Sequence, residues 1–297
     1  MRKIYIAGAG GMLGQAFYRN FSDAELRCTD IDTNEEWLSH LDFRDLDRYR
    51  RDVRDFKPDA LFHLGAHTDL EFCELNAEDA YATNTMAVKH AVLIANEIEI
   101  PLFYVSTAGI FDGLKEAYDE WDVPRPLGHY ARSKYLGERV VVDHAHQYLV
   151  CRAGWMMGGG PRKDKKFVQK IMAQLKAGKS KIHVVSDKFG SPTYTHDFAA
   201  NARILLESER WGLYNMTCSG QTSRLEVARE VVRVLGLADR ICIEEVDSSF
   251  FGEEYFAVRP QSERLINRKL DMHGLNIMRD WHVALGEYLS DDYRDYL

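Results

Sequence analysis

The chain has 297 residues, of which 45% are hydrophobic and 28% are charged, and its formal net charge is −8. This composition is typical of a globular protein, and the length allows one large α/β domain or a large domain with a smaller one. An acidic surface attracts neither nucleic acid nor an anionic membrane, so both are excluded as main partners. No apolar run approaches the roughly 20 residues of a membrane span. The start Met1-Arg2-Lys3 leads into a strand and not into a signal peptide, which predicts a cytoplasmic protein.

The cysteines are odd in number and scattered, and several fall in predicted strands: Cys28, Cys73, Cys151, Cys218 and Cys242. We expect buried free thiols and neither a disulfide framework nor a zinc site. His63 and His67 flank the end of a predicted strand, where their side chains need not converge, and no third ligand accompanies them. We therefore expect packing and loop residues here and no metal site.

The first predicted element is a strand over residues 3–7 that breaks into glycines and continues as a helix. Gly8, Gly11 and Gly14 stand three apart, which suits, in that order, a tight turn, a close approach to a pyrophosphate, and close packing of the helix on the strand. The helix starts at Met12 and Leu13, and its free N–H groups and positive dipole end would face the phosphates. This stretch predicts a dinucleotide-binding fold, and a purely structural glycine turn is the alternative.

The second predicted strand covers residues 25–29 and ends at Asp30. A carboxylate about twenty residues past the glycines is where dinucleotide folds bind the ribose hydroxyls of the adenosine. Asp30 and Asp32 would repel the 2′-phosphate of NADP, and the loop from Gly8 to Gly14 has no Lys or Arg to offset them. This favours NAD(H) over NADP(H). Arg27 leaves NADP(H) open, and Asp30 could instead be a turn residue.

Two further stretches are assigned to the cofactor. Asp42 and Phe43 precede a helix predicted to run to residue 56, and the Asp42 carboxylate would bind the adenine amino group unless it is an exposed turn residue. A buried strand over residues 60–64 opens into Gly65-Ala66-His67-Thr68, small residues that let the chain lie against a flat ligand. We assign Ala66 and His67 to the cofactor, with His67 near the nicotinamide.

Strands and helices alternate in this half of the chain. A helix is predicted over residues 77–97 and a strand over residues 101–105, which ends in Ser106-Thr107. Such alternation predicts a doubly wound parallel α/β sheet, a Rossmann fold, whose ligands bind at the carboxyl ends of the strands. Four of the singled-out positions fall at such ends, namely Gly8, Asp30, Gly65 and Thr107.

The residues with catalytic chemistry are Tyr130 and Lys134. They stand four apart in a predicted helix, so both side chains lie on one face. A phenol titrates near pH ~10 and exchanges protons slowly at neutral pH unless its anion is stabilised, which a neighbouring ammonium does. No other Tyr in the chain has a Lys four residues later, and this pair follows the Ser-Thr strand end. We therefore prefer a catalytic pair over a surface pair.

With these motifs the sequence resembles the extended short-chain dehydrogenase/reductases, and among them the dTDP-4-dehydrorhamnose reductase family. The resemblance covers essentially the whole chain. It is carried by the N-terminal glycines, Ala66-His67-Thr68, Ser106-Thr107 with Phe111-Asp112-Gly113, the stretch from Tyr130 to Lys134, Arg152 to Trp155, Gly190 to Thr193, and Arg259-Pro260 with Ser262 and Leu265.

The resemblance implies an NAD(P)H-dependent reductase of a nucleotide-linked 4-keto sugar, in polysaccharide biosynthesis. It implies that Tyr130 protonates the alkoxide that develops as hydride leaves the nicotinamide. Lys134 would lower the pKa of Tyr130 and hold the nicotinamide ribose, and Thr107 would hydrogen-bond the carbonyl oxygen. Donors placed where charge develops are the expected source of rate.

One position departs from the family pattern. The family usually has Asp-Tyr directly after Ser-Thr, with the Tyr touching the sugar, whereas this chain has Ala108-Gly109. The substrate is therefore open, and we assign Ala108 to its site. Small residues here also resemble the sugar-nucleotide 4-epimerases, which retain their NAD. The 4,6-dehydratases rank low because the Asp-Glu pair expected after the Thr is missing.

An alternative that is not an enzyme is a regulatory subunit that binds NAD(P) without turnover, since relatives of the family include a regulatory partner of methionine adenosyltransferase. Intact Thr107, Tyr130 and Lys134 argue against this alternative.

We expect a dinucleotide-binding domain over residues 1–157 and a smaller α/β substrate lobe over residues 158–297, with part of residues 181–218 returning to the first domain. Helices are predicted near residues 167–175 and 225–235 and from residue 280, and strands near residues 182–185, 212–216 and 241–246. Residues 190–193 are predicted to form a turn that borders the substrate. A homodimer is a further expectation.

Three residues are assigned to the substrate besides Ala108. Trp155 would stack on the sugar or base, or belong to the core. Lys165 lies in a basic cluster over residues 162–166 that would bind the diphosphate of a nucleotide sugar, or be solvated. Arg259, kept off a helix by Pro260, would clamp the diphosphate through its bidentate fork, or be a surface Arg.

Overall fold

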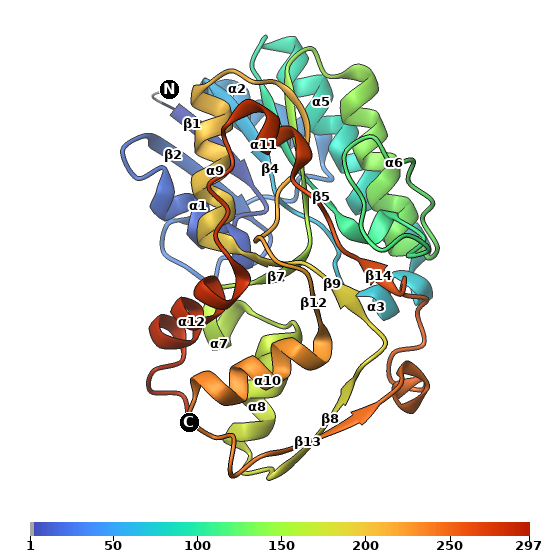
Figure 1. Ribbon diagram of the computed structural model, residues 1–297. Coiled ribbons are helices and arrows are strands. Elements are labelled where there is room, and N and C mark those ends of the chain that lie inside the picture. Colours follow the sequence, from blue (N-terminus) through green and yellow to red (C-terminus); the bar gives the residue numbers. More distant parts are fainter. Residues whose placement is uncertain (1–2) are drawn as a thin grey trace.

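The computed structural model describes residues 3–297, so Met1 and Arg2 lie outside the described residues. Its central feature is a seven-stranded sheet in the order β11-β6-β5-β4-β1-β2-β3, with every neighbouring pair parallel (Figure 1). The strands are β1 (Lys3–Ala7), β2 (Glu25–Asp30), β3 (Leu38–His40), β4 (Ala60–His63), β5 (Leu102–Thr107), β6 (Tyr148–Ala153) and β11 (Gly212–Asn215). This order confirms the predicted doubly wound parallel α/β fold.

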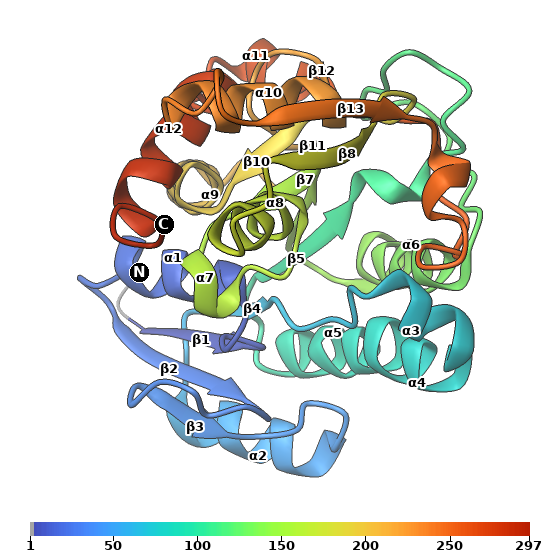
Figure 2. The same ribbon diagram turned by 90° about the horizontal axis from the view of Figure 1, so that it is seen from below.

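Helices cover both faces of the sheet (Figure 2). On one face α1 (Met12–Asn20) packs against α9 (Thr195–Glu207), and α2 (Leu46–Phe56), α5 (Ala87–Glu97) and α6 (His129–His144) cover the other. Strand residues alternate between the two sides. Ile4 and Ile6 belong to the core under α1 and α9, whereas Tyr5 and Ala7 belong to the core under α2 and α5. Both faces are thus buried, as is typical of parallel sheets.

The helix predicted over residues 77–97 is interrupted. It consists of α4 (Ala77–Tyr81), a π-helical turn (Ala82–Met86) and α5. The π-helical turn carries the fully buried Asn84, whose amide bonds to both the N–H and the C=O of His67. Single π-helical turns are frequent at functional sites.

The second half of the chain builds a lobe beside the sheet, drawn below it in Figure 1. Its helices are α7 (Gly160–Lys163), α8 (Phe167–Lys176), α10 (Arg224–Val234) and α12 (Trp281–Asp292). Its strands form small sheets: β7 (Trp155–Met157) with β10 (Pro192–Tyr194), β8 (Lys181–Val185) with β13 (Cys242–Val246), and β9 (Phe189–Gly190) between β12 (Thr222–Ser223) and β14 (Ser262–Glu263).

The turn predicted at residues 190–193 is wrong. Gly190 ends β9 and Pro192 begins β10, so this stretch belongs to two short strands. Pairing of β10 with β7 and of β9 with β12 and β14 satisfies the backbone groups that a turn would have left to water.

Elements of the second half also return to the sheet. α9 packs on α1, β11 extends the sheet beside β6, and α11 (Arg268–His273) packs on β11. We did not predict α9 or α11 from the sequence. The division at residue 157 stays a prediction.

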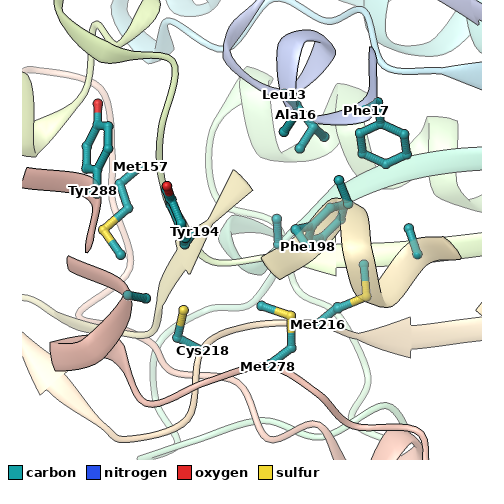
Figure 3. Close-up of a cluster of buried hydrophobic side chains, with 14 of the residues drawn as sticks. Leu13, Ala16, Phe17, Met157, Tyr194, Phe198, Met216, Cys218, Met278 and Tyr288 are labelled. Atoms are coloured by element: carbon teal, nitrogen blue, oxygen red, sulfur yellow. The ribbon is translucent and has the colours of Figure 1, made fainter. Parts of the chain in front are cut away.

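One apolar core joins the sheet to the lobe. The Phe17 ring of α1 lies 5.4 Å from that of Phe62, 5.3 Å from that of Phe103 and 6.4 Å from that of Phe198, measured between ring centres. Figure 3 shows the cluster continuing from Phe198 past Met216 and Met278 to Tyr194, Met157 and Tyr288. Residues of α8 and α10 belong to the same cluster, so the lobe is packed onto the sheet and not tethered to it.

The cysteines are all free, and four of them are buried. Cys242 is exposed, so the expected burial is wrong at this position. It begins β13, which pairs on one side only, with β8.

Among residues 3–297 no helix combines the length and the apolar character that a bilayer span requires.

Two glycine-to-alanine substitutions should have opposite effects. A Cβ at Gly14 would lie 1.9 Å from the carbonyl oxygen of Ala9, whereas a Cβ at Gly286 in α12 would meet no atom within 4 Å. We expect Gly14→Ala to lower the free energy of unfolding by roughly 1–3 kcal/mol or more, because α1 must move away from the turn after β1. Gly286→Ala, the matched control, should raise it by about 0.5–1 kcal/mol. Urea denaturation followed by circular dichroism measures both, and equal effects would contradict the close packing at Gly14.

Candidate active site

The glycine turn after β1 contacts the end of β4. Gly8 has a φ of +77°, and a Cβ there would lie 2.2 Å from the Cα of Gly65, so the two strand ends meet by backbone contact. Gly11 is the N-cap of α1, and a Cβ there would meet no atom within 4 Å. The first N–H groups of the helix, including those of Met12 and Leu13, have no partner inside it. This open helix start fits a pyrophosphate group.

Asp30 ends β2 beside this turn. Its carboxylate accepts hydrogen bonds from the N–H of Gly10 (2.8 Å) and from the N–H of Asp32 (3.0 Å). Each carboxylate oxygen has a second acceptor site, so Asp30 can still accept from ribose hydroxyls. Arg27, the residue that left NADP(H) open, makes a bidentate ion pair with Asp52 at 2.8 and 3.2 Å.

Asp42 and Phe43 follow β3. The Asp42 carboxylate accepts a forked pair of hydrogen bonds from Arg44, at 2.7 and 3.0 Å, which lowers its pKa. Phe43 is buried against Gly65, where a Cβ would lie 2.2 Å from its ring. Phe43 therefore shapes the end of β4, and Asp42 is already ion-paired.

Ala66 and His67 leave β4 as a segment held by hydrogen bonds. The N–H of His67 donates to Asn84 (2.8 Å) and its C=O accepts from the same amide (3.0 Å). Its imidazole Nε2 lies 3.0 Å from the Asp79 carboxylate, and its ring packs on Phe72 of the short helix α3 (Leu70–Leu75). Ala66 is half-buried within this fixed backbone.

His63, the last residue of β4, is a packing residue. It is buried, and burial lowers its pKa to about 3, so the imidazole is neutral. Within the part of the chain that the structure describes, no three His, Cys, Asp or Glu side chains gather in a way that would hold a metal ion.

Thr107, Tyr130 and Lys134 come together at the carboxyl end of β5. Tyr130 lies in the first turn of α6 and Lys134 one turn later, and α6 packs on β5. A Cβ at Gly109 would lie 3.5 Å from Oγ1 of Thr107 and 3.7 Å from the ring of Tyr130. The Nζ of Lys134 donates to the carbonyl of Val105 at 2.7 Å. The structure thus brings the three predicted catalytic residues to one strand end.

Burial sets the protonation of this pair. It raises the pKa of Tyr130 to about 12, opposed by a hydrogen bond with Thr107 and reinforced by the charge of Glu263. It lowers the pKa of Lys134 to about 7, opposed by the charge of Glu138. Tyr130 therefore carries its proton at neutral pH. The expectation that Lys134 lowers the pKa of Tyr130 stays a prediction, since here the ammonium donates to Val105.

A buried ion pair fixes α6 on the sheet. Glu138 (2% exposed) accepts from Arg152 (3% exposed) at 2.6 and 2.9 Å, and from the hydroxyl of Ser106 at 2.6 Å. The ion pair and its bond to Ser106 connect α6 with β5 and β6, one helical turn after Lys134. We did not assign Glu138 from the sequence, although its position four residues after Lys134 was a usable signal.

A second polar group faces Thr107 and Tyr130 from the lobe. The same Cβ position at Gly109 lies 3.3 Å from Oε1 of Glu263, in β14. The other oxygen of this carboxylate accepts from the indole N–H of Trp155 at 2.7 Å. We did not assign Glu263 from the sequence, and its only signal was its place between Ser262 and Leu265, which carried the family resemblance.

Arg224 begins α10 beside this group. Its guanidinium carbon lies 3.7 Å from the ring centre of Trp155, and burial lowers its pKa to about 10, opposed by the charge of Glu263. The Trp155 ring is therefore stacked on Arg224. No sequence motif had marked Arg224.

The other residues assigned to the substrate differ in their surroundings. Ala108 is buried next to Thr107, in a short 3₁₀ turn. Arg259 makes a bidentate ion pair with Glu71, at 2.7 and 2.8 Å. Lys165 is exposed. Its neighbour Lys166 donates to the carbonyl and hydroxyl of Thr68, in the segment after β4, at 2.8 and 3.0 Å.

A family model described as the RmlD substrate binding domain matches residues 1–294. The chain belongs to this family. This chain is 30% identical over 292 residues to the spore coat polysaccharide biosynthesis protein SpsK of Bacillus subtilis, and the match covers 98% of each chain. It is 32% identical over 294 residues to a dTDP-4-dehydrorhamnose reductase of Mycobacterium tuberculosis, covering 97% of this chain and 92% of the relative.

Solved structures agree with this assignment. The dTDP-4-dehydrorhamnose reductase of Bacillus anthracis, solved in complex with NADP, is similar with a TM-score of 0.88 and 25% identity, over 98% of this chain and all (100%) of that one. These findings confirm the family resemblance that the sequence motifs indicated.

The pKa of Lys134 predicts how the stability of this RmlD family protein varies with pH. Because the pKa is about 7 in the folded chain and 10.5 without the fold, the unfolded state binds more protons between these values. Stability should therefore rise with pH in that window. From pH 7 to roughly pH 9, below the titration of tyrosine, we expect the cofactor-free wild type to gain roughly 2 kcal/mol over Lys134→Met.

Urea titrations at constant ionic strength measure this difference. Lys89→Met, which removes an exposed lysine of α5, is the control and should run parallel to the wild type. A constant offset between the wild type and Lys134→Met across the window would rule out the lowered pKa.

Proposed function

We propose that this protein is an NAD(P)H-dependent reductase of a nucleotide-linked 4-keto sugar of the dTDP-4-dehydrorhamnose kind. The observation that carries the proposal is the meeting of Thr107, Tyr130 and Lys134 at the end of β5, at the same edge of the sheet as the glycine turn that fits a pyrophosphate. Relatives named dTDP-4-dehydrorhamnose reductase, similar over nearly the whole chain, support it.

Several groups of the chain would hold a nicotinamide dinucleotide. Gly8, Gly11 and the first N–H groups of α1 would hold the pyrophosphate, Asp30 the adenosine ribose, and the Ala66-His67 backbone would lie along the cofactor. When bound, the dinucleotide would supply the hydride. Lys134 would bind the nicotinamide ribose.

Tyr130 would act as the proton donor. Its phenol is protonated at neutral pH because burial raises its pKa, so it can give its proton to the carbonyl oxygen as negative charge develops there. The hydroxyl of Thr107 would donate to the same oxygen. Both donors are fixed before the reaction by β5 and α6, so little reorganisation is needed in the transition state.

The nucleotide end of the substrate would meet the cations of the lobe. Arg224, Arg259 and Lys166 lie close enough to influence one another, since Arg224 feels the charge of Arg259, and Lys166 feels that of Arg224. A diphosphate is the chemical group that such a cluster binds well. Arg259 would exchange its pairing with Glu71 for the diphosphate.

The preference for NAD(H) over NADP(H) is part of the proposal. Asp30 and Asp32 put negative charge where a 2′-phosphate would lie. The nearby cations are engaged, because Arg27 pairs with Asp52 and Lys163 with Glu35 (3.1 Å). A cytoplasmic location and a homodimer stay predictions.

Tyr130→Phe should abolish the reductase reaction. We expect kcat for dTDP-4-dehydrorhamnose with NADH to fall by roughly 10²–10⁴-fold, because the ring stays and the proton donor is lost. NADH absorbance measures turnover, and consumption equal to the keto sugar reduced separates a reductase from an epimerase, which returns its hydride. Tyr135→Phe, one turn along α6, should keep wild-type activity. Undiminished turnover in Tyr130→Phe would remove the basis of the assignment.

Asp30→Asn should shift the cofactor preference. The amide keeps an acceptor for the Gly10 N–H and loses the charge, so kcat/KM for NADPH relative to NADH should rise roughly tenfold or more. The ratio is obtained from initial rates with each cofactor. Asp23→Asn, in the exposed pair with Arg203 before β2, is the matched control and should leave the ratio unchanged. A wild type that prefers NADPH, or an unchanged ratio in Asp30→Asn, would refute the charge argument.

A further inference from the structure

Glu263 holds a carboxylate beside Thr107 and Tyr130, the two residues proposed to receive the reacting carbonyl. Its Oε1 lies 3.3 Å from the Cβ position of Gly109, and that position is 3.5 Å from the Thr107 hydroxyl and 3.7 Å from the Tyr130 ring. Gly109 has no side chain to cover this point. This point is instead approached by Glu263, which lies more than 150 residues later in the chain.

The carboxylate is held in one orientation. Trp155 donates to Oε2 at 2.7 Å, and its indole is fixed between the Arg224 guanidinium, 3.7 Å from the ring centre, and Gly190, where a Cβ would lie 2.3 Å from the ring. β14 itself pairs with β9. Within residues 3–297 no side chain or backbone group donates to Oε1. One oxygen is thus anchored and the other faces the site.

Arg224 opposes the charge of Glu263 and Trp155 bonds to its Oε2, but Oε1 faces the site without a donor from the described residues. A fixed negative charge beside Thr107 and Tyr130 opposes the negative charge that develops on the carbonyl oxygen. An ionised carboxylate only accepts hydrogen bonds, so whatever faces Oε1 must donate one. A donor on the substrate would satisfy this oxygen and screen its charge.

We propose that Glu263 is a specificity-determining residue, and that it selects a sugar with a hydrogen-bond donor, a hydroxyl or a protonated amine, beside the carbonyl to be reduced. Trp155 acts as its positioning residue. The inference rests on the proposed function for the identity of the reacting carbonyl. It adds the substituent that this site recognises and the residue that recognises it.

The main test compares Glu263→Ala and Glu263→Gln with the wild type, using dTDP-4-dehydrorhamnose as the hydroxyl-bearing probe and saturating NADH. We expect Glu263→Ala to lose ten- to hundredfold in kcat/KM, because a charge-assisted hydrogen bond is lost. NADH affinity and thermal stability should stay near the wild-type values. Glu25→Gln, an exposed carboxylate at the amino end of β2, is the matched control and should change nothing.

The second arm identifies the donor. Gln keeps an acceptor oxygen and loses the charge. A hydroxyl is indicated if Glu263→Gln stays within a few-fold of the wild type for the keto sugar. An amine is indicated if a dTDP-linked 3-amino-3,6-dideoxyhexose competes with the keto sugar in the wild type and its inhibition constant rises tenfold or more in Glu263→Gln. Either result supports the proposal.

Trp155→Phe tests the positioning role. It removes the N–H that anchors Glu263 and keeps a ring under Arg224, so KM for the keto sugar should rise several-fold with kcat nearly unchanged. Equal losses in kcat and in NADH affinity would mean a structural role instead.

The proposal is overturned if both Glu263 variants stay within twofold of the wild type for the keto sugar and for the amino sugar. That outcome differs from failure of the proposed function, in which the wild type does not oxidise NADH with the keto sugar or Tyr130→Phe remains active. In that case the role of Glu263 is still tested by calorimetric binding of the two sugar nucleotides to the wild type and to Glu263→Ala. Equal binding to the two proteins, or no binding to either, rejects a role for Glu263.

Discussion

The buried ion pair between Glu138 and Arg152 is the interaction on which the candidate site depends. It places a helix carrying Tyr130 and Lys134 against the strand that ends in Thr107, with Ser106 as a third partner. Both charges are almost fully buried, so removing one would leave the other uncompensated. Such a change lowers the free energy of unfolding by about 3–5 kcal/mol. A small rotation of α6 would move the phenol away from the strand end, and this pair opposes it.

The same constraint explains the protonation of the catalytic pair. Close packing of α6 on β5 removes most of the water around Lys134 and part of it around Tyr130, and this desolvation lowers the pKa of Lys134 and raises that of Tyr130. Glu138 therefore acts twice, as an anchor of the helix and as the negative charge that keeps Lys134 from losing its proton more readily. The packing of α6 on β5 therefore determines both the position of the helix and the pKa values of Tyr130 and Lys134.

The substrate side is organised by different elements. The lobe brings the cations Arg224 and Lys166 to its side that meets the sheet. It also brings the carboxylate of Glu263, which is bonded to the Trp155 indole that stacks on Arg224. The cations would suit the diphosphate of a nucleoside diphosphate sugar, whereas Glu263, in our proposal, recognises the sugar itself. Gly109 makes this arrangement possible, because a larger side chain there would occupy the space in front of the carboxylate.

The sequence by itself determined the fold class and the family, and it predicted which residues form the cofactor half of the site. Strand, glycine turn and helix follow one another over a few residues, and the Tyr130–Lys134 spacing lies within one helical turn, so local periodicity was sufficient to find them. It did not determine the short strands at residues 190–194, the π-helical turn at Asn84, or the roles of Glu138, Arg224 and Glu263. These depend on contacts between residues that are far apart in the chain, such as Trp155 with Glu263. Only the packing of the lobe on the sheet decided which of the many charged side chains face the site, because a charged residue has no local pattern that distinguishes a buried partner from a solvated one.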